Sequence, residues 1–223
     1  MFKNTFSLVI SILFLNGCVT ALSFKDAPVF LKKLDDKTRQ VIFVQNSNDT
    51  KVSPKLILWE KNSGRWEPVF DPIPAVVGRQ GIAALDEKRE GDGKTPSGAY
   101  SLGSAFGYAS SIHTKLDYYQ VTENDFWVDD PKSLQYNQWV HATPQANSFE
   151  RLKRDDDLYK YGLVINYNTD PVVPGKGSAI FLHVWRGQNQ PTAGCVAVAE
   201  KDIIRILQWL DKDKHPVIIL FST

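Results

Sequence analysis

Short runs of apolar and polar residues, separated by turn-forming residues, dominate the first part of the chain after its N-terminal leader. The segments 39–45 and 55–60 are rich in β-branched, aromatic and other apolar residues, which favours strands. The intervening stretch begins with 46–49, Asn-Ser-Asn-Asp, which is typical of a turn, so the pair is expected to form a β-hairpin or meander. A second pair of strands is predicted at 65–70 and 74–77.

The remainder of the chain also favours short strands. Further strands are expected after the turn at 93–98 and at 117–121, 161–167, 178–184 and 216–221. The segment 178–184 is a nearly continuous apolar run, which is typical of a central strand. The segment 148–153 has a capping Ser, an acid in its first turn and one apolar pair at helical spacing, which predicts a short helix.

One segment has a clear helical pattern. In 200–210 the apolar residues recur every three or four positions, which predicts an amphipathic helix near the C-terminus. No internal repeat or linker divides the chain beyond its first residues. Residues 39–223 are therefore expected to form a single, mainly β domain with a few short helices and this one C-terminal amphipathic helix.

The first residues have the pattern of an export signal. Lys3 precedes the mostly apolar run 7–15, which is shorter than the roughly 20 residues that a permanent membrane helix needs. The sequence that follows, Leu15-Asn16-Gly17-Cys18, resembles the lipobox of bacterial lipoproteins, in which the Cys receives a lipid after cleavage. An ordinary signal peptide cut near Ala21 is the alternative.

The lipobox interpretation sets the predicted organisation of the whole chain. Residues 1–18 would be a signal peptide ending at a lipidated Cys18, residues 19–38 a tether, and residues 39–223 the folded domain. The protein is then expected in the periplasm or cell envelope, anchored to a membrane by its N-terminal lipid.

Charge excludes one class of partner. The chain has 26 Lys and Arg against 25 Asp and Glu, so its net charge predicts no basic surface for nucleic acid.

Cysteine usage directs attention to a single thiol. The chain has two cysteines, Cys18 and Cys195. If Cys18 is lipidated or removed, Cys195 has no disulfide partner in an oxidising compartment, where a free thiol is a liability unless it has a function.

A reactive thiol needs a neighbour that promotes its ionisation. His183, near the end of a predicted buried strand, and Cys195, at the end of the following loop, are expected to meet across adjacent strands. Gly194 lacks a Cβ and would let a substrate carbonyl approach main-chain N–H groups that stabilise an oxyanion. The alternative is that Cys195 is a small core residue and His183 a buried, hydrogen-bonded one.

Four separated stretches carry a resemblance to a known family. The two that contain the predicted site are 177–187, Gly-Ser-Ala-Ile-Phe-Leu-His-Val-Trp-Arg-Gly, and 191–197, Pro-Thr-Ala-Gly-Cys-Val-Ala. Upstream lie 76–79, Val-Val-Gly-Arg, and 91–98, which contains Gly-Lys-Thr-Pro-Ser-Gly. Together they resemble, from about Val41 to the C-terminus, the YkuD-like L,D-transpeptidase catalytic domains.

The resemblance implies a fold and a reaction. The fold would be the family's β-sandwich or barrel, and the substrate the stem peptides of peptidoglycan. Cys195 would be the nucleophile, His183 the general base, and the amides around Gly194 and Cys195 the oxyanion donors. The thiolate would expel a terminal D-alanine, and an amine from a second stem, water, a free D-amino acid or a lipoprotein would resolve the acyl-enzyme.

The sequence departs from the family pattern beside the nucleophile. Many members have a second His before the Gly-Cys pair and an Arg or Asn two residues after the Cys, where this chain has Ala193 and Ala197. Thr192, Arg186 and Trp185 are instead the candidates for substrate binding, with surface packing as the alternative for the last two.

The other conspicuous polar residues suggest less. His113, His141 and His215 have no Cys or carboxylate at metal-ligand spacing, so no metal site is predicted, and the reaction needs no cofactor. The segment 129–139, which includes Asp129, Asp130, Tyr136, Asn137 and Trp139, either lines the cleft or forms a turn over a packed aromatic ring. A carboxypeptidase, a hydrolase that releases wall-anchored lipoprotein, and a non-catalytic wall-binding lipoprotein remain as alternative functions.

Overall fold

The computed structural model describes residues 31, 34–46 and 53–222. The elements in this part of the chain are, in order, β1 (Gln40–Asn46), β2 (Lys55–Asn62), β3 (Arg65–Pro68), β4 (Ile73–Val76), β5 (Gly98–Gly107), β6 (Tyr118–Gln120), β7 (Asp125–Val128), β8 (Trp139–His141), β9 (Phe149–Arg151), β10 (Tyr161–Ile165), β11 (Phe181–Val184), β12 (Val196–Val198), α1 (Glu200–Trp209), the 3₁₀ turn η2 (Lys212–Lys214) and β13 (Val217–Ser222). The mainly β fold class predicted from the sequence is confirmed.

The main sheet closes on itself. Its strands follow the order β1-β13-β5-β10-β11-β12-β4-β2, and β2 pairs in turn with β1. Strands β3 and β6 add to its outside by pairing with β2 and β5. The result is a barrel, which leaves no open edge along its closed ring of strands.

Alternation along the strands divides the core into two layers. Ile42 and Val44 of β1 belong to the large central cluster, together with Leu56 and Leu58 of β2. The intervening residues of these strands face the other way, where Val41, Phe43, Ile57, Trp59 and Ile219 form a second cluster covered by Leu31. Because successive side chains of a strand point to opposite faces, a β1 that is buried on both faces needs cover on its outer face, and Leu31, Leu34 and Trp66 contribute to it.

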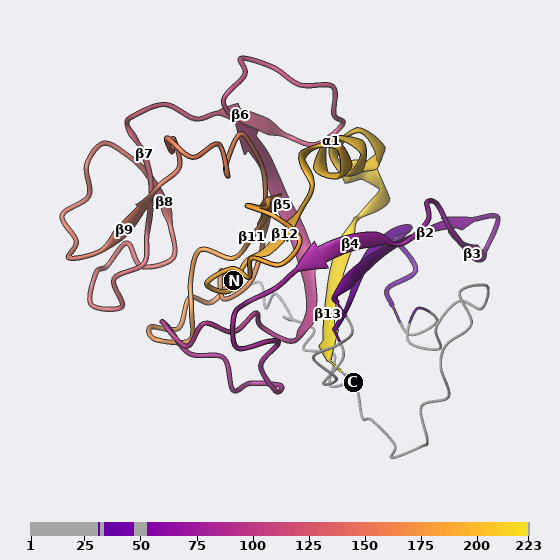
Figure 1. Cartoon of the computed structure of the whole chain (residues 1–223), viewed down its shortest axis with the longest axis horizontal. Coiled ribbons are helices and arrows are strands. Elements are labelled where there is room, and N and C mark those ends of the chain that lie inside the picture. The colour runs from indigo at the N-terminus through magenta and orange to yellow at the C-terminus, as the bar shows by residue number, and fades with distance from the viewer. Residues whose placement is uncertain (1–30, 32–33, 47–52, 223) are drawn as a thin grey trace, which may run out of the picture.

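A small second sheet lies beside the barrel. It has the order β8-β7-β9 and is seen in Figure 1 on the side of the molecule away from β2 and β3. The short helix predicted at 148–153 is wrong, because this segment forms β9, whose Phe149 and Arg151 pair with Val128 and Phe126 of β7. One apolar pair at helical spacing stabilises a short helix only weakly, whereas pairing with the adjacent β7 gives the segment backbone hydrogen bonds along its length.

The predicted C-terminal helix is confirmed as α1. Its apolar side buries Ile203, Ile206 and Leu207 in the central cluster of the barrel. Its first turn carries Glu200 and Asp202, whose negative charges complement the helix dipole. In Figure 1 this helix covers one end of the barrel, near β6.

The structure leaves the predicted N-terminal organisation untested. The signal peptide at 1–18, with Cys18, lies outside the described residues, and so does most of the proposed tether at 19–38. Among the residues that the structure describes, no helix is both long and apolar enough to span a bilayer.

Candidate active site

Strand register brings the predicted nucleophile and base to one face of the barrel. Strands β11 and β12 are parallel neighbours, with Leu182 opposite Val196 and His183 opposite Ala197. Cys195 directly precedes β12, so the same register places it beside Phe181. Phe181 is two residues before His183 and therefore lies on the same face of β11. Leu182 points into the barrel, while Phe181 and Cys195 share a separate apolar cluster on its outer face.

The orientation of His183 defines its basic nitrogen. The side chain is buried, with 5% of its surface exposed, and its Nδ1 lies 2.7 Å from the Val184 carbonyl oxygen. A carbonyl accepts but cannot donate, so Nδ1 carries the proton and Nε2 is left as the base. The imidazole also packs edge-to-face on Tyr159, with ring centroids 5.1 Å apart.

Two backbone groups contact the Cys195 sulfur. The thiol donates to the Ala179 carbonyl oxygen at 3.2 Å, and the Phe181 N–H donates to Sγ at 3.4 Å. The Cys195 residue as a whole is 8% exposed, so its thiol is buried. In this arrangement the S–H proton is directed at a main-chain oxygen rather than at the imidazole.

Burial keeps the His183 imidazole and the Cys195 thiol uncharged. Desolvation lowers the pKa of His183 from 6.5 to about 4, with a smaller contribution in the same direction from Arg154. Desolvation, followed by the Glu150 carboxylate, raises the pKa of the Cys195 thiol well above its ordinary value. At neutral pH the site therefore holds a neutral thiol and a neutral imidazole, an arrangement suited to general-base activation during attack.

The loop that carries Cys195 is held by hydroxyl groups. Thr192 Oγ1 donates to the Cys195 carbonyl oxygen at 2.6 Å and accepts the Gly194 N–H at 3.1 Å. Thr95 Oγ1 approaches the same carbonyl at 3.4 Å. The Thr192 hydroxyl thus both donates and accepts a hydrogen bond within the loop. The Gly194 amide, predicted as an oxyanion donor, is bonded to this hydroxyl.

Two glycines with no room for a Cβ explain how the separated motifs fit together. A Cβ on Gly194 would lie 3.0 Å from the Lys94 carbonyl oxygen, and one on Gly78 only 2.4 Å from the Gly93 carbonyl oxygen. Gly78 also pairs with Thr192 in an isolated bridge and donates its N–H to Thr95 Oγ1 at 2.9 Å. The motifs at 76–79 and 91–98 therefore pack directly against the loop that carries Cys195.

An aromatic wall and a carboxylate lie beneath the pair, and the sequence did not identify them. Phe181 packs edge-to-face against Trp127 of β7 at 5.0 Å and against Tyr159 at 5.6 Å. The Tyr159 hydroxyl donates a hydrogen bond to Glu150 of β9. Burial raises the pKa of Glu150. Tyr159 and Glu150 lie in no motif, so only the packing of the small sheet on β11 identifies them.

The remaining predicted substrate contacts lie at the edge of the site. Arg186 is an exposed side chain whose Nη2 contacts Asp156 Oδ2 at 3.2 Å, and Asp156 also accepts two hydrogen bonds of 2.7 Å from Arg154. These guanidinium groups, Arg154 first, hold the pKa of Asp156 far below its ordinary range. Trp185 is half-buried and donates its main-chain N–H to Val198 at 2.8 Å.

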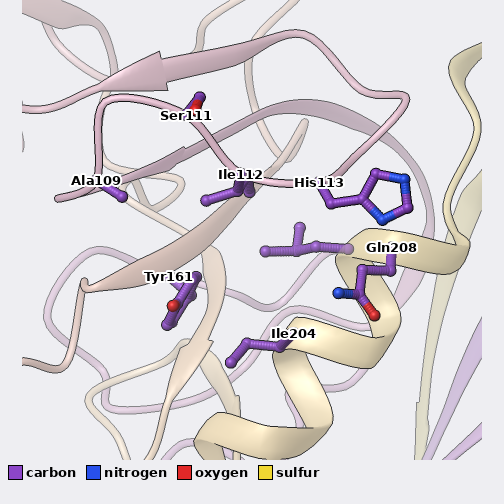
Figure 2. Close-up of a pocket in the computed structure, with 8 residues that line it drawn as sticks. Ala109, Ser111, Ile112, His113, Tyr161, Ile204 and Gln208 are labelled. Atoms are coloured by element: carbon purple, nitrogen blue, oxygen red, sulfur yellow. The ribbon is translucent and has the colours of Figure 1, made fainter.

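Other polar candidates lie apart from the thiol. A cavity of about 210 Å³ lies between α1 and the loop after β5, and its lining includes neither Cys195 nor His183. Figure 2 shows the side chains that line it, among them His113, Tyr161 and Gln208. His141 pairs with Asp125 at 2.6 Å on the small sheet. Within the described part of the chain, no group of three or more His, Cys, Asp or Glu residues is arranged to hold a metal ion.

Comparison with known proteins identifies a family and a similar solved structure. The model of the L,D-transpeptidase catalytic domain, YkuD, matches residues 36–219. A search of curated protein sequences finds no match. Among solved structures, the chain is similar to the helical cell shape determining protein Pgp2 from Campylobacter jejuni, with 17% identity and a TM-score of 0.42 over 86% of this chain and 53% of that chain. This chain therefore spans about half the length of that protein.

Proposed function

Because this chain belongs to the YkuD family of L,D-transpeptidase catalytic domains, we propose that it is a cysteine acyltransferase that acts on peptidoglycan stem peptides. The observation that carries the proposal is the placement of Cys195 and His183 on one face of adjacent parallel strands. The three family-like motifs that pack around the Cys195 loop support it.

In the first half-reaction the two neutral groups act together. His183 Nε2 removes the thiol proton as Sγ attacks the carbonyl carbon of the third stem-peptide residue, so a sulfur–carbon bond forms and the carbonyl oxygen becomes negative. The main-chain N–H of Cys195 is the proposed donor to that oxyanion. Collapse of the intermediate breaks the bond to the terminal D-alanine, which leaves as an amine after it takes the proton from His183.

In the second half-reaction an amine from another stem attacks the thioester. Neutral His183 removes its proton, the carbon–sulfur bond breaks, and Cys195 leaves as a thiol. The product is a 3→3 cross-link. Water in place of the amine would give a tripeptide, so the same two residues support hydrolysis as well.

The substrate contacts and the location form part of this proposal. Arg186 is 58% exposed at its side chain, and its contact with Asp156 leaves the guanidinium at the surface, where a substrate carboxylate would reach it. Trp185 is proposed as an apolar wall and Thr192 as a contact to the peptide backbone. The protein is proposed to act in the cell envelope, with a lipid on Cys18 as its anchor.

The proposal is tested by incubating the purified full-length protein with tetrapeptide muropeptides and identifying the products by mass spectrometry. Variant Cys195→Ala is the control for the nucleophile, and His183→Gln for the base. A 3→3 dimer that both variants fail to make is the expected result.

The other outcomes separate the alternatives. Tripeptide without dimer would identify a carboxypeptidase that uses the same thiol. If the wild type yields no product from these muropeptides or from a lipoprotein linked to peptidoglycan, while it still binds cell wall, the acyltransferase proposal is wrong and the chain is a binding module.

A further inference from the structure

Two buried residues near the thiol have left-handed backbone conformations. Ala179 has φ of 52° and Asn137 has φ of 57°. Such a conformation is unfavourable for a residue with a Cβ, and more so for alanine than for asparagine. Its presence at Ala179, two residues before Phe181 and in contact with the nucleophile, indicates that the surrounding structure holds this peptide in place.

The Asn137 side chain holds Ala179 in this conformation by a hydrogen bond. The side chain is buried, with 4% of the residue exposed, and all of its hydrogen-bonding positions are used. Its Oδ1 accepts from the Ala179 N–H at 3.1 Å and from Trp127 Nε1 at 2.9 Å. Its Nδ2 donates to the carbonyl oxygens of Tyr167 at 3.0 Å and Asn168 at 2.7 Å. Asn137 thus ties the β7–β8 connection to the segment that leads into β11.

The carbonyl group of Ala179 contacts the Cys195 thiol. With its N–H fixed by Asn137, Ala179 presents its carbonyl oxygen to Cys195 Sγ at 3.2 Å. A carbonyl oxygen accepts from S–H but repels a thiolate at the same distance, so this contact favours the protonated form. The Phe181 N–H, at 3.4 Å, has the opposite effect.

We propose that Asn137 is a positioning residue that fixes the Ala179 carbonyl and thereby holds the Cys195 thiol in a protonated resting orientation. The inference rests on Cys195 being the nucleophile of the proposed function, but its test needs no substrate. The charged and titratable groups that act on this thiol include Glu150, Lys88, Arg154 and Tyr159, and His183 lies on the same face of the adjacent strand. None of them bonds to Asn137, so Asn137→Ala removes no hydrogen bond that they make.

The test measures the pH at which the Cys195 thiolate forms, from its ultraviolet absorbance, in full-length protein that carries Cys18→Ser. The Cys195→Ala chain supplies the baseline. Asn137→Ala removes the acceptor of the Ala179 N–H, whereas the matched control Trp127→Phe removes another bond to the same Oδ1 and leaves Ala179 bonded. We expect the Asn137→Ala thiolate fraction below the midpoint to rise about fivefold over wild type, the equivalent of about 1 kcal/mol for one hydrogen bond. Trp127→Phe keeps an aromatic ring against Phe181 and leaves the Ala179 N–H bonded, so its thiolate fraction is expected to change much less than that of Asn137→Ala.

Equal midpoints in the two variants would overturn the inference, since a general loosening of the small sheet affects both. If Asn137→Ala does not fold, Ala179→Gly decides the question, because glycine adopts the same backbone at no steric cost, keeps the N–H bond to Asn137 and lacks the methyl group through which packing would hold alanine. The infrared S–H stretch and the thiolate midpoint should then match wild type. A shift of either towards its value in unfolded protein would show that alanine packing, rather than Asn137, places the carbonyl.

Discussion

The neutral state of His183 makes a quantitative prediction about stability and pH. Burial lowers the pKa of this imidazole from 6.5 in the unfolded chain to about 4 in the folded protein. Between these values the unfolded chain binds a proton that the folded protein does not. Stability from this group is therefore fully present above pH 6.5 and is lost as the pH falls towards 4.

The magnitude follows from the separation of the two pKa values. Each unit corresponds to about 1.4 kcal/mol, so lowering the pH from 7 to 5 costs about 2 kcal/mol and the full effect near pH 4 is about 3 kcal/mol. Other groups titrate in the same range, and a variant is needed to isolate this one. His183→Gln removes the imidazole and keeps a side chain of similar length.

The assay is urea unfolding of wild type and His183→Gln at pH 7, 6 and 5. The difference in unfolding free energy between them should change by about 2 kcal/mol from pH 7 to 5, in the direction that weakens wild type. The difference in unfolding free energy between Cys195→Ala and wild type should stay constant over this range, because the thiol is protonated in both the folded and the unfolded state. If the difference in unfolding free energy between wild type and His183→Gln also stayed constant, or if the His183 imidazole titrated by NMR near pH 6.5, the idea of a buried neutral base would be refuted.

Three further predictions concern the same site. Because burial raises the pKa of Cys195, wild type should lose stability relative to Cys195→Ala as the pH rises above about 8.5, and unchanged differences between pH 8 and 10 would contradict this. Gly194→Ala should lower activity at least tenfold and stability by about 1–3 kcal/mol, because its Cβ would meet the Lys94 carbonyl at 3.0 Å; the control Gly187→Ala, whose Cβ meets no atom within 4 Å, should do neither in the same urea and muropeptide assays. Arg186→Ala should raise KM for a tetrapeptide without changing kcat or Tm, since an exposed ion pair adds at most about 1 kcal/mol, and an unaltered KM would limit Arg186 to the surface pair with Asp156.

Local sequence patterns determined the type of most elements and pointed to the proposed catalytic pair. Alternation and β-branched residues identified most of the strands, and the three- and four-residue spacing in 200–210 identified α1, because each pattern reflects a face that a single element must bury. The family resemblance, read from residues around His183 and Cys195 and from two upstream motifs, is confirmed by the match over 36–219. The weak helical signal at 148–153 failed because the partner that makes it β9 lies about 20 residues away in β7.

The tertiary structure decided how these parts meet and in what electrostatic state. Closure of the barrel requires β1 to pair with β13 at the other end of the chain, a contact that no local pattern encodes. The low pKa of His183 and the high pKa of Cys195 come from desolvation, which depends on the small sheet that packs against β11. Asn137 and Ala179 are ordinary residues in the sequence, and their relation to the thiol exists only because folding brings the β7–β8 connection against the start of β11.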